Sequence, residues 1–393
     1  MQKAQWAILL FGLEIGLICN RNRRGNPLIL LSSINKKYEQ VRTFTPKYYI
    51  MKLSANSKLQ MMLFCVSLCF LFAGTADAQK FKYSIPGFDA DSLKESFIVA
   101  GGSSTVLRAG QGEVIWNNSL TSYWLALHQS DQNSPILDRF RATQFISDIY
   151  GFYGISESAK WDVGIHIRYT RTRVDNAASS SMFKVFNSSG DLDALFEANP
   201  GGAIFDQSIG DISSVGLRFR SAPITTDPKF VINGGFAIKT VTGEEKARQL
   251  AADRNTADIG FTYYKGLNTN TYYFFGGTFQ TFFPSSGVND QYLFNTSVNF
   301  SLIQRPFGDK WTFYPGLSYS LAFKPSQSPS ETSALIRTNE FLFAFGGIQY
   351  APNTNYNFFF TGGFPLISSV TNPQQEIVRS SYSNLTLGLR LGL

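Results

Sequence analysis

Residues 161–174 read WDVGIHIRYTRTRV, and apolar and polar side chains alternate along this stretch. One parity is apolar and holds Trp161, Val163, Ile165, Ile167 and Tyr169. The other parity is polar or small and holds Asp162, Gly164, His166, Arg168 and Thr170. Successive side chains of a β-strand point to opposite faces, so a period of two predicts a strand with one apolar face. Its length exceeds that of most soluble strands and suits a strand that crosses a membrane at a tilt.

The same alternation recurs along the chain and predicts about twelve strands. They are expected at 112–127, 137–154, 160–174, 212–221, 229–242, 256–267, 270–284, 290–304, 310–324, 338–350, 354–368 and 380–393. An even number of long strands with one apolar face is typical of bacterial outer-membrane barrels. The fold class predicted is therefore all-β, a transmembrane antiparallel up-and-down β-barrel.

The connections between these strands alternate in length. If the N-terminal end is periplasmic, the odd connections face the outside and include the long segment 175–211. The even connections are short, such as the turn at Asn268–Thr269. Long outer loops and short periplasmic turns are typical of membrane barrels. Aromatic residues near the strand ends are expected to form an interfacial girdle: Trp116, Trp124, Trp161, Trp311, Tyr350 and Tyr356.

The N-terminal region predicts export. Residues 51–78 have a short basic start, an apolar core and the small-residue pattern Ala76-Asp77-Ala78, which together indicate a cleaved signal peptide. Residues 1–50 are interpreted as an upstream extension from a mistaken start, because a complete signal begins at Met51. Residues 79–111 are expected to form a periplasmic or plug segment, and 112–393 the barrel in the cell outer membrane.

Removing residues 1–78 changes the charge of the chain. Those residues hold 10 of the 35 Lys and Arg and 3 of the 28 Asp and Glu, which leaves 25 of each. A near-neutral protein gives no reason to expect a nucleic-acid partner. All three cysteines precede residue 79, so no disulfide or thiolate metal site is expected in the mature chain. The expected partners are outer-membrane lipid and a small solute, with the chain either monomeric or homo-oligomeric; the length of segment 175–211 would allow an inward constriction loop.

Polar residues on the lumenal parity are the candidate functional residues. Those expected to line the lumen are Arg139, Arg141, His166, Arg168, Arg218, Arg220, Lys239 and Arg390. One interpretation is a basic wall that favours anionic solutes, as rings of Arg and Lys do in anion pores. The other is a set of cross-lumen ion pairs with inward acids such as Glu113 and Asp162. Both remain open from the sequence.

Pairs of glycines recur within the predicted strands, including Gly346-Gly347 and Gly362-Gly363. Glycine inside a strand marks a kink or a close approach. The favoured interpretation is curvature for barrel closure. The alternative is a gap in the wall through which an apolar solute leaves sideways.

An enzymatic role is not expected. One class of twelve-strand barrel is a phospholipase, whose chemistry needs a serine and a histidine within hydrogen-bond reach. His166 has Arg168 rather than a nucleophile at the same-face spacing, and His128 belongs to a predicted loop. No catalytic residue, cofactor or metal site is predicted.

The stretch 208–323 resembles the outer-membrane proteins associated with the meta-pathway of phenol degradation, a group similar to FadL-type transporters. The resemblance is carried by SIGDISSVGLRFR, then PKFVINGGFAIKTVTGEE, ADIGFTYYKGL and WTFYPGLSYSL. Gly210, Asp211, Lys239, Thr242 and Gly243 stand at the family's positions. The resemblance implies passage of small, hydrophobic or aromatic compounds and identifies no binding residue. The function expected is a channel or transporter for small solutes, hydrophobic or anionic. The alternative is a surface-interaction barrel that displays its loops without transport.

Overall fold

The computed structural model describes most of the chain from Val106 onward. It describes residues 6–10, 13–17, 98–99, 102–103 and 106–392, except 157, 159, 189, 191–203, 225–228, 269, 285–290, 308–309, 327–334, 353–355, 371 and 373. The predicted signal peptide lies outside the described residues. Two short hairpins, β1 (Trp6–Leu10) with β2 (Leu13–Leu17) and β3 (Ile98–Val99) with β4 (Gly102–Ser103), form sheets separate from the main one.

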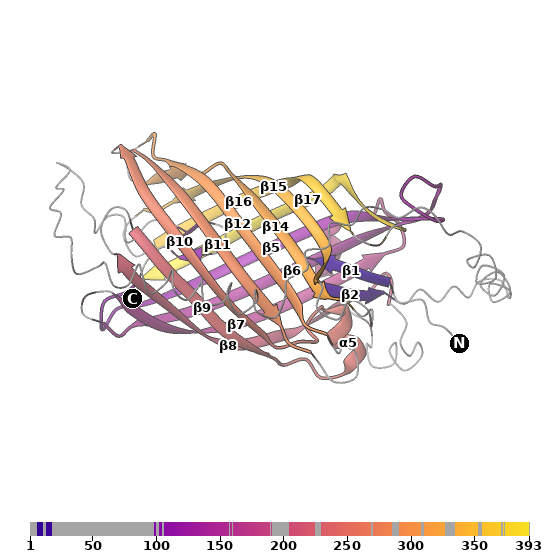
Figure 1. Cartoon of the computed structure of the whole chain (residues 1–393), viewed down its shortest axis with the longest axis horizontal. Helices are drawn as coiled ribbons and strands as arrows, with labels where there is room; N and C mark the ends of the chain where they lie inside the picture. The colour runs from indigo at the N-terminus through magenta and orange to yellow at the C-terminus, as the bar shows by residue number, and fades with distance from the viewer. Residues whose placement is uncertain are drawn as a thin grey trace.

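The main sheet is a closed antiparallel barrel (Figure 1). Its strands are β5 (Gly112–His128), β6 (Ile136–Gly154), β7 (Trp161–Asp175), β8 (Ser208–Ile224), β9 (Lys229–Lys239), β10 (Thr256–Asn268), β11 (Thr271–Phe282), β12 (Leu293–Gln304), β13 (Trp311–Phe313), β14 (Gly316–Pro325), β15 (Leu335–Tyr350), β16 (Tyr356–Val370) and β17 (Gln375–Gly392). The pairing of β17 with β5 joins the last strand to the first.

Twelve strands result, because β13 and β14 are one strand interrupted at Tyr314 and Pro315. Pro315 has no N–H to donate to a neighbour, so the regular ladder stops there. Two hydrogen bonds continue across the interruption, from Tyr314 N to the Gly347 carbonyl and from Leu302 N to the Pro315 carbonyl, both 3.0 Å. The twelve-strand fold class and the approximate strand positions predicted from alternation are confirmed.

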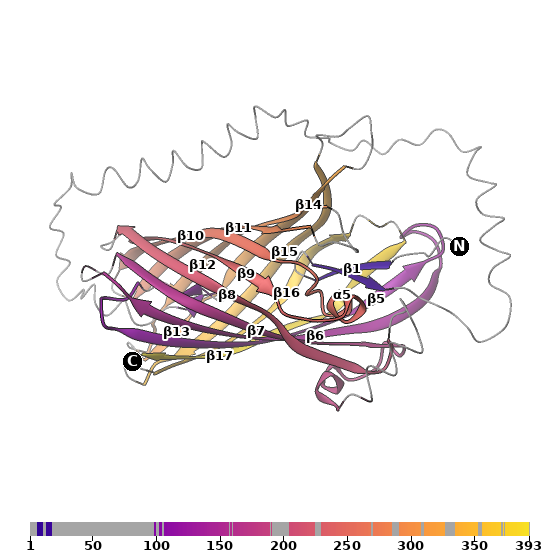
Figure 2. The same ribbon diagram turned by 90° about the horizontal axis from the view of Figure 1, so that it is seen from below.

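The two ends of the barrel differ as the lengths of the connections predicted. One end carries the short turns and the C terminus, and the other carries the helix α5 (Glu244–Gln249) (Figures 1 and 2). Among the described residues, no helix is long and apolar enough to cross a membrane. We call the end with the C terminus periplasmic and the end with α5 extracellular, following the rule that periplasmic turns are short.

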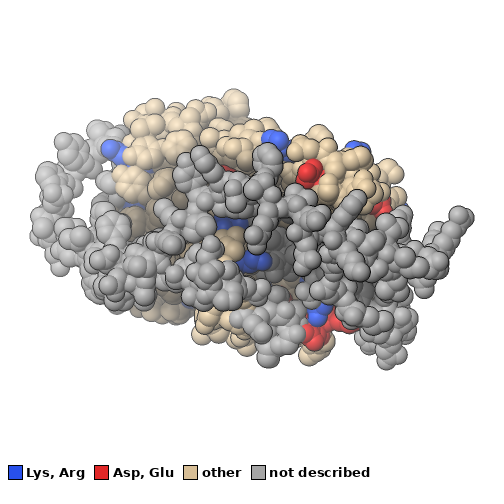
Figure 3. Space-filling view, turned by 45° about the vertical axis from the view of Figure 1, so that its right-hand side comes forward, with Lys and Arg blue, Asp and Glu red and all other residues tan. Residues whose placement is uncertain are grey.

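An apolar belt surrounds the barrel. Large apolar side chains on the outward parity of each strand are exposed, including Ile165 at 56%, Leu217 at 69% and Phe364 at 57%. Where described residues are visible in Figure 3, most are neither Lys or Arg nor Asp or Glu. Contiguous exposed apolar area of this kind marks a surface that is covered in its own environment, here by lipid. At the periplasmic rim the rings of Trp311 and Tyr350 pack with centroids 4.6 Å apart, as an aromatic girdle would.

Candidate functional site: the lumen and the β16–β17 seam

The strand register assigns each side chain to the lumen or to the outer face. Buried Glu113 pairs with Phe152 across β5 and β6, and outward Trp116 pairs with Ile149. When these pairs are followed from strand to strand around the barrel, the side chains that point into the middle of the lumen are mainly small or polar. Examples are Thr121, Gln144, Ser297, Asn299, Ser318, Ser320 and Thr361. The interior is therefore polar at mid-height, whereas its two ends are filled by larger groups.

At the periplasmic end, a buried ion cluster joins four strands. Arg220 Nη1 lies 2.5 Å from Glu113 Oε1, and Arg220 Nη2 lies 2.6 Å from Asp162 Oδ2. Arg390 Nε lies 2.6 Å from Glu113 Oε2. All four side chains are at most 5% exposed, so the two arginines balance the two carboxylates inside the protein. Breaking such a pair leaves a buried charge uncompensated, which costs about 3–5 kcal/mol.

The chain that precedes β5 is bound to this cluster. Leu107 N donates to Asp162 Oδ2 at 3.0 Å, and Leu107 packs with Ile115, Phe152 and Phe359 in the barrel interior. Ala109 N donates to the Ser156 carbonyl at 3.0 Å, across the turn between β6 and β7. Residues 106–111 thus run over the periplasmic rim and contribute to filling that end.

A second charged group lies farther up the same wall. Asp148 accepts hydrogen bonds from Arg168 Nε and contacts His166 Nε2, each at 2.7 Å. His166 stacks on Tyr150 with ring centroids 4.5 Å apart. Arg218 Nη1 lies 2.5 Å from Asp258 Oδ2. The inward arginines of β7 and β8 therefore each have a carboxylate partner.

The register also shows where each candidate lumen residue lies. His166, Arg168, Arg218, Arg220 and Arg390 stand on the inward parity. Lys239 has the same parity at the extracellular end of β9, is exposed, and its backbone N donates to Asn255 Oδ1 at 3.0 Å.

The prediction that Arg139 and Arg141 line the lumen is wrong. Both share the outward parity of Ile149 and Tyr153 on β6. The sequence analysis equated polar with inward along the whole of β6. That equation fails above the apolar belt, where polar residues stand on the outward parity and the inner face packs apolar residues. There Phe140 and Ala142 face inward, and Ala142 joins Tyr123 and Ala251 in a buried cluster.

The extracellular mouth is crossed by the segment that follows α5. Ala251, from the β9–β10 connection, packs with Tyr123, Phe341 and Tyr382 on strands on the far side of the ring. Lys246 of α5 pairs with Asp211 of β8 at 2.6 Å. The described parts of segment 175–211 lie in two places. The short 3₁₀ helix η1 (Met182–Phe186) packs Phe186 on the outward residue Phe145, with ring centroids 5.0 Å apart. Phe205 instead packs at the mouth, with its ring centroid 5.4 Å from that of the inward Phe140, and Ile204 packs with Leu250 of the β9–β10 connection. The mouth is thus narrowed by the β9–β10 connection together with the residues that precede β8.

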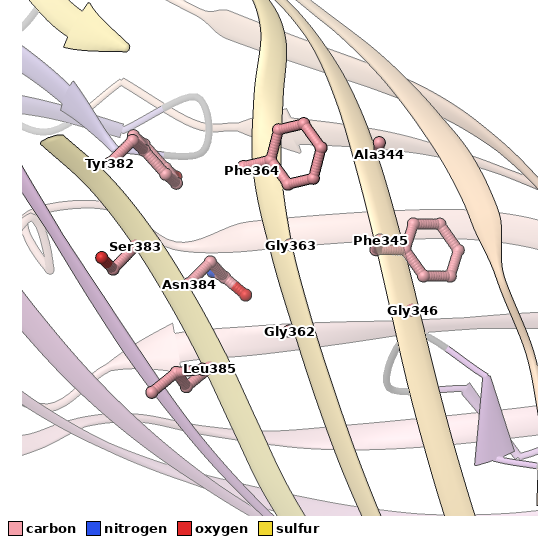
Figure 4. Close-up of a pocket in the computed structure, with 10 residues that line it drawn as sticks. All are labelled: Ala344, Phe345, Gly346, Gly362, Gly363, Phe364, Tyr382, Ser383, Asn384 and Leu385. Atoms are coloured by element: carbon pink, nitrogen blue, oxygen red, sulfur yellow. The ribbon is translucent and has the colours of Figure 1, made fainter. Parts of the chain in front are cut away.

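One seam of the wall is incomplete. Residues of β16 and β17 pair from Tyr356↔Leu391 to Gly363↔Asn384, and no pairing follows beyond that point in the described residues. Each of the two strands stays paired with its other neighbour. The pairing of β15 with β16 continues to Asn339↔Val370, and that of β17 with β5 continues to Gln375↔Leu127. The two strands diverge there (Figure 4).

A pocket of about 400 Å³ occupies this part of the wall. It is lined by Ala344, Phe345, Gly346, Gly362, Gly363, Phe364, Tyr382, Ser383, Asn384 and Leu385 (Figure 4). Phe345, Gly363 and Asn384 stand on the inward parity, whereas Gly346, Gly362 and Leu385 stand on the outward parity. Residues of both parities therefore line the pocket, at the point where the pairing of β16 with β17 ends. Backbone that is not hydrogen-bonded is tolerated at membrane depth only where it is covered by protein or lines a cavity.

The glycines create the space in this pocket. A Cβ added at Gly346 would meet no atom within 4 Å, and at Gly362 the nearest atom would be Leu385 Cδ2 at 3.6 Å. By contrast, a Cβ at Gly347 would lie 2.2 Å from the Tyr314 ring. The two glycines of the pair Gly346-Gly347 thus have different roles. Gly347 makes room for a buried ring, whereas Gly346, like Gly362, leaves space on the outer face.

The two histidines have ordinary structural partners. His166 contacts Asp148 and Tyr150, as described above. His128 Nδ1 contacts the Ser134 carbonyl at 2.8 Å, and its Nε2 lies 3.1 Å from Glu376. Within the part of the chain that the structure describes, neither histidine is hydrogen-bonded to a serine hydroxyl, which a serine hydrolase would need.

Comparisons with known proteins match at the level of fold. No family model matches the chain, and no curated protein matches its sequence. Among solved structures, an outer-membrane channel from Pseudomonas putida F1 aligns over 75% of this chain and 100% of its own, with a TM-score of 0.51 and 11% identity. A mutant of the TodX monoaromatic hydrocarbon channel aligns over 73% of this chain and 90% of its own, with a TM-score of 0.36 and 12% identity. At these identities the likeness shows the fold, that of an outer-membrane β-barrel.

Proposed function

We propose that this protein is an outer-membrane channel for small apolar solutes, and that these solutes pass between the lumen and the bilayer through the opening between β16 and β17. The observation that carries the proposal is the loss of pairing beyond Gly363 and Asn384, together with the pocket at that place. A cavity of about 150 Å³ holds benzene. The pocket of about 400 Å³ is therefore large enough for a single-ring aromatic compound.

The side chains on the lumenal side of the opening suit such a solute. Tyr382 stacks on Tyr123 with ring centroids 5.6 Å apart and lies 5.4 Å from Phe343. Phe345 belongs to the pocket lining. Pockets that hold apolar ligands are lined mainly by aromatic and aliphatic side chains with a few polar groups. Asn384, which donates to Thr121 at 2.8 Å, supplies the polar group here.

Anion conduction receives less support than it did from the sequence. Arg168, Arg218, Arg220 and Arg390 are matched by Asp148, Asp258, Asp162 and Glu113. An anion-selective pore needs fixed positive charge in excess, and these eight residues carry none. These paired charges along β7 and β8 favour an uncharged solute over an anion.

The test measures the flux of an apolar solute after larger side chains have been placed in the opening between β16 and β17. Gly346→Leu with Gly362→Leu places two side chains in the pocket, without clash with the backbone. Gly151→Leu is the control, because a Cβ there lies 3.5 Å from Ile165 on a fully paired part of the wall. We expect uptake of toluene by cells whose lipopolysaccharide-covered outer membrane carries the protein to fall about fivefold in the double variant, equivalent to about 1 kcal/mol on the barrier, and to stay unchanged in the control. Equal flux in all three proteins would reject the lateral route, and no flux in the unaltered protein would reject transport.

A further inference from the structure

A group of arginines lies on the outside of the barrel, above the apolar belt. Arg139 and Arg141 stand on the outward parity of β6, and Arg171 and Arg173 on that of β7. The register sets Arg171 opposite Phe145 and Arg141 opposite Asp175. We call these four residues the rim arginines. Arg141, Arg171 and Arg173 lie on the paired part of β6 and β7, and Arg139 lies two residues beyond its end on β6.

The position of the patch relative to the membrane follows from the number of residues that separate it from the apolar belt along β7. Ile165 and Ile167 on β7 belong to the exposed apolar belt. Arg171 lies four residues farther toward the extracellular end, about 13 Å along the strand at about 3.3 Å per residue. Arg141 lies beyond Phe145 on β6 in the same direction. Arg171 is therefore at the level where hydrocarbon gives way to lipid headgroups on the outer side. Arg173, Arg141 and Arg139 follow farther out in steps of two residues, about 7 Å each along the strand.

The patch keeps its positive charge. Arg141 donates through Nε to the Ala178 carbonyl at 2.9 Å and through Nη1 to Ser122 Oγ at 3.1 Å. Arg171 Nη2 donates to the Asn187 carbonyl. These partners are neutral. Arg173 pairs with Asp175 at 2.8 Å. Among the described residues, Asp175 is the single carboxylate on the outward parity of β5, β6 and β7 above the apolar belt. The inward arginines of β7, β8 and β17, in contrast, are each matched by an acid.

Apolar side chains accompany the cations. Helix η1 lies against the outer wall, and its Phe183 and Phe186 are 58% and 48% exposed. Lys184, between them, is also exposed. Exposed aromatic residues beside basic ones are typical of elements that lie in a membrane interface.

We propose that the rim arginines and η1 bind the phosphorylated glucosamine headgroup of the outer-leaflet glycolipid, lipopolysaccharide. Guanidinium groups bind phosphate oxygens in pairs, and basic clusters at the membrane surface bind anionic lipid headgroups. The phosphates would contact Arg139, Arg171 and Lys184, while Phe183 and Phe186 insert among the acyl chains. This site is on the outside of the barrel and is independent of the proposed solute route.

The test compares lipid binding of charge-reversed proteins. Arg139→Glu with Lys184→Glu changes two exposed side chains and leaves the loop contacts of Arg141 and Arg171 in place. Lys265→Glu is the control, because Lys265 is an exposed cation at the periplasmic end of β10. Full-length protein purified from outer membranes, stripped of lipid and transferred to detergent, is titrated with bis-phosphorylated lipid A and followed by native mass spectrometry.

We expect the double variant to bind lipid A about tenfold more weakly than the unaltered protein, with the Lys265→Glu control unchanged. Dephosphorylated lipid A should bind as weakly to the unaltered protein as lipid A does to the double variant. Inorganic phosphate in excess should compete only partly, because it lacks the acyl chains. Equal binding by the double variant and the unaltered protein, or equal binding of dephosphorylated lipid A, would overturn the proposal. Heat-modifiable migration on gels checks that each variant is folded.

Discussion

The wall formed by β5 to β8 differs from the wall formed by β15 to β17. In the first, pairing between β5 and β6 is continuous from Gly112↔Tyr153 to Leu127↔Asp138, and buried ion pairs join the strands across the lumen. In the second, pairing stops at Gly363↔Asn384, and glycines replace the larger side chains. One side of the barrel is thus held by ion pairs and continuous backbone pairing. The other side lacks this pairing at the place where we propose that an apolar solute passes.

The largest expected effect is on the fixed wall. Arg220→Met leaves Glu113 and Asp162 buried with one positive partner fewer, and Arg220 also lies 3.7 Å above the Phe152 ring. We expect the free energy of unfolding to fall by about 3–5 kcal/mol, measured by urea unfolding in lipid vesicles. Arg139→Met removes an exposed arginine from the same wall and is expected to change stability by less than about 0.5 kcal/mol. Similar losses for both variants would contradict the role of the ion cluster.

A smaller effect is expected where the chain before β5 meets this wall. A Cβ added at Gly154 would lie 1.9 Å from the Arg108 carbonyl oxygen, so the two backbones approach too closely for any other residue. Gly154→Ala should destabilise the protein by about 1–3 kcal/mol and expose residues 106–111 to protease. Gly151→Ala, three residues away and without such a contact, serves as the control. Unchanged protease resistance in Gly154→Ala would show that the segment is held elsewhere.

The smallest expected effect concerns charge in the lumen. Arg168→Gln leaves Asp148 without its arginine, although the contact with His166 remains. The interior then loses one positive charge, so any conductance in a planar bilayer should shift toward cations. The measurement is the reversal potential in a salt gradient, with Arg139→Gln as the outward-facing control. A shift toward anions, or an equal shift in the control, would contradict the assignment of the two arginines to opposite faces.

Local periodicity was sufficient to predict the strands, because a period of two along residues such as 161–170 has no other common structural meaning. It was insufficient for Arg139 and Arg141. Their parity was misassigned because the meaning of polar and apolar reverses above the membrane, and the sequence alone does not mark that height. The interruption at Pro315 had a signal in the sequence, since proline lacks a ladder donor.

From the sequence, a gap in the wall was only the second interpretation of the glycine pairs. Gly362-Gly363 fits both curvature and a gap, and which one applies depends on where the pairing of two strands ends. The ion pairs were also an alternative, because Glu113 and Arg220 are 107 residues apart and meet only when the ring is closed. Both features are properties of the assembled barrel rather than of any one strand.

The most direct test of the lateral route is a reversible closure of the seam. Extending the register by one pair beyond Gly363↔Asn384 would bring Phe364 opposite Ser383, so Phe364→Cys with Ser383→Cys places a disulfide across the opening. The control is Ser119→Cys with Thr386→Cys, whose native hydroxyls lie 2.9 Å apart on paired strands. All native cysteines lie at or before Cys69, far from both sites in the sequence. We predict that oxidation stops toluene flux in the Phe364/Ser383 variant, that reduction restores it, and that the control is unaffected. Flux that continues through an oxidised, cross-linked seam would contradict the account.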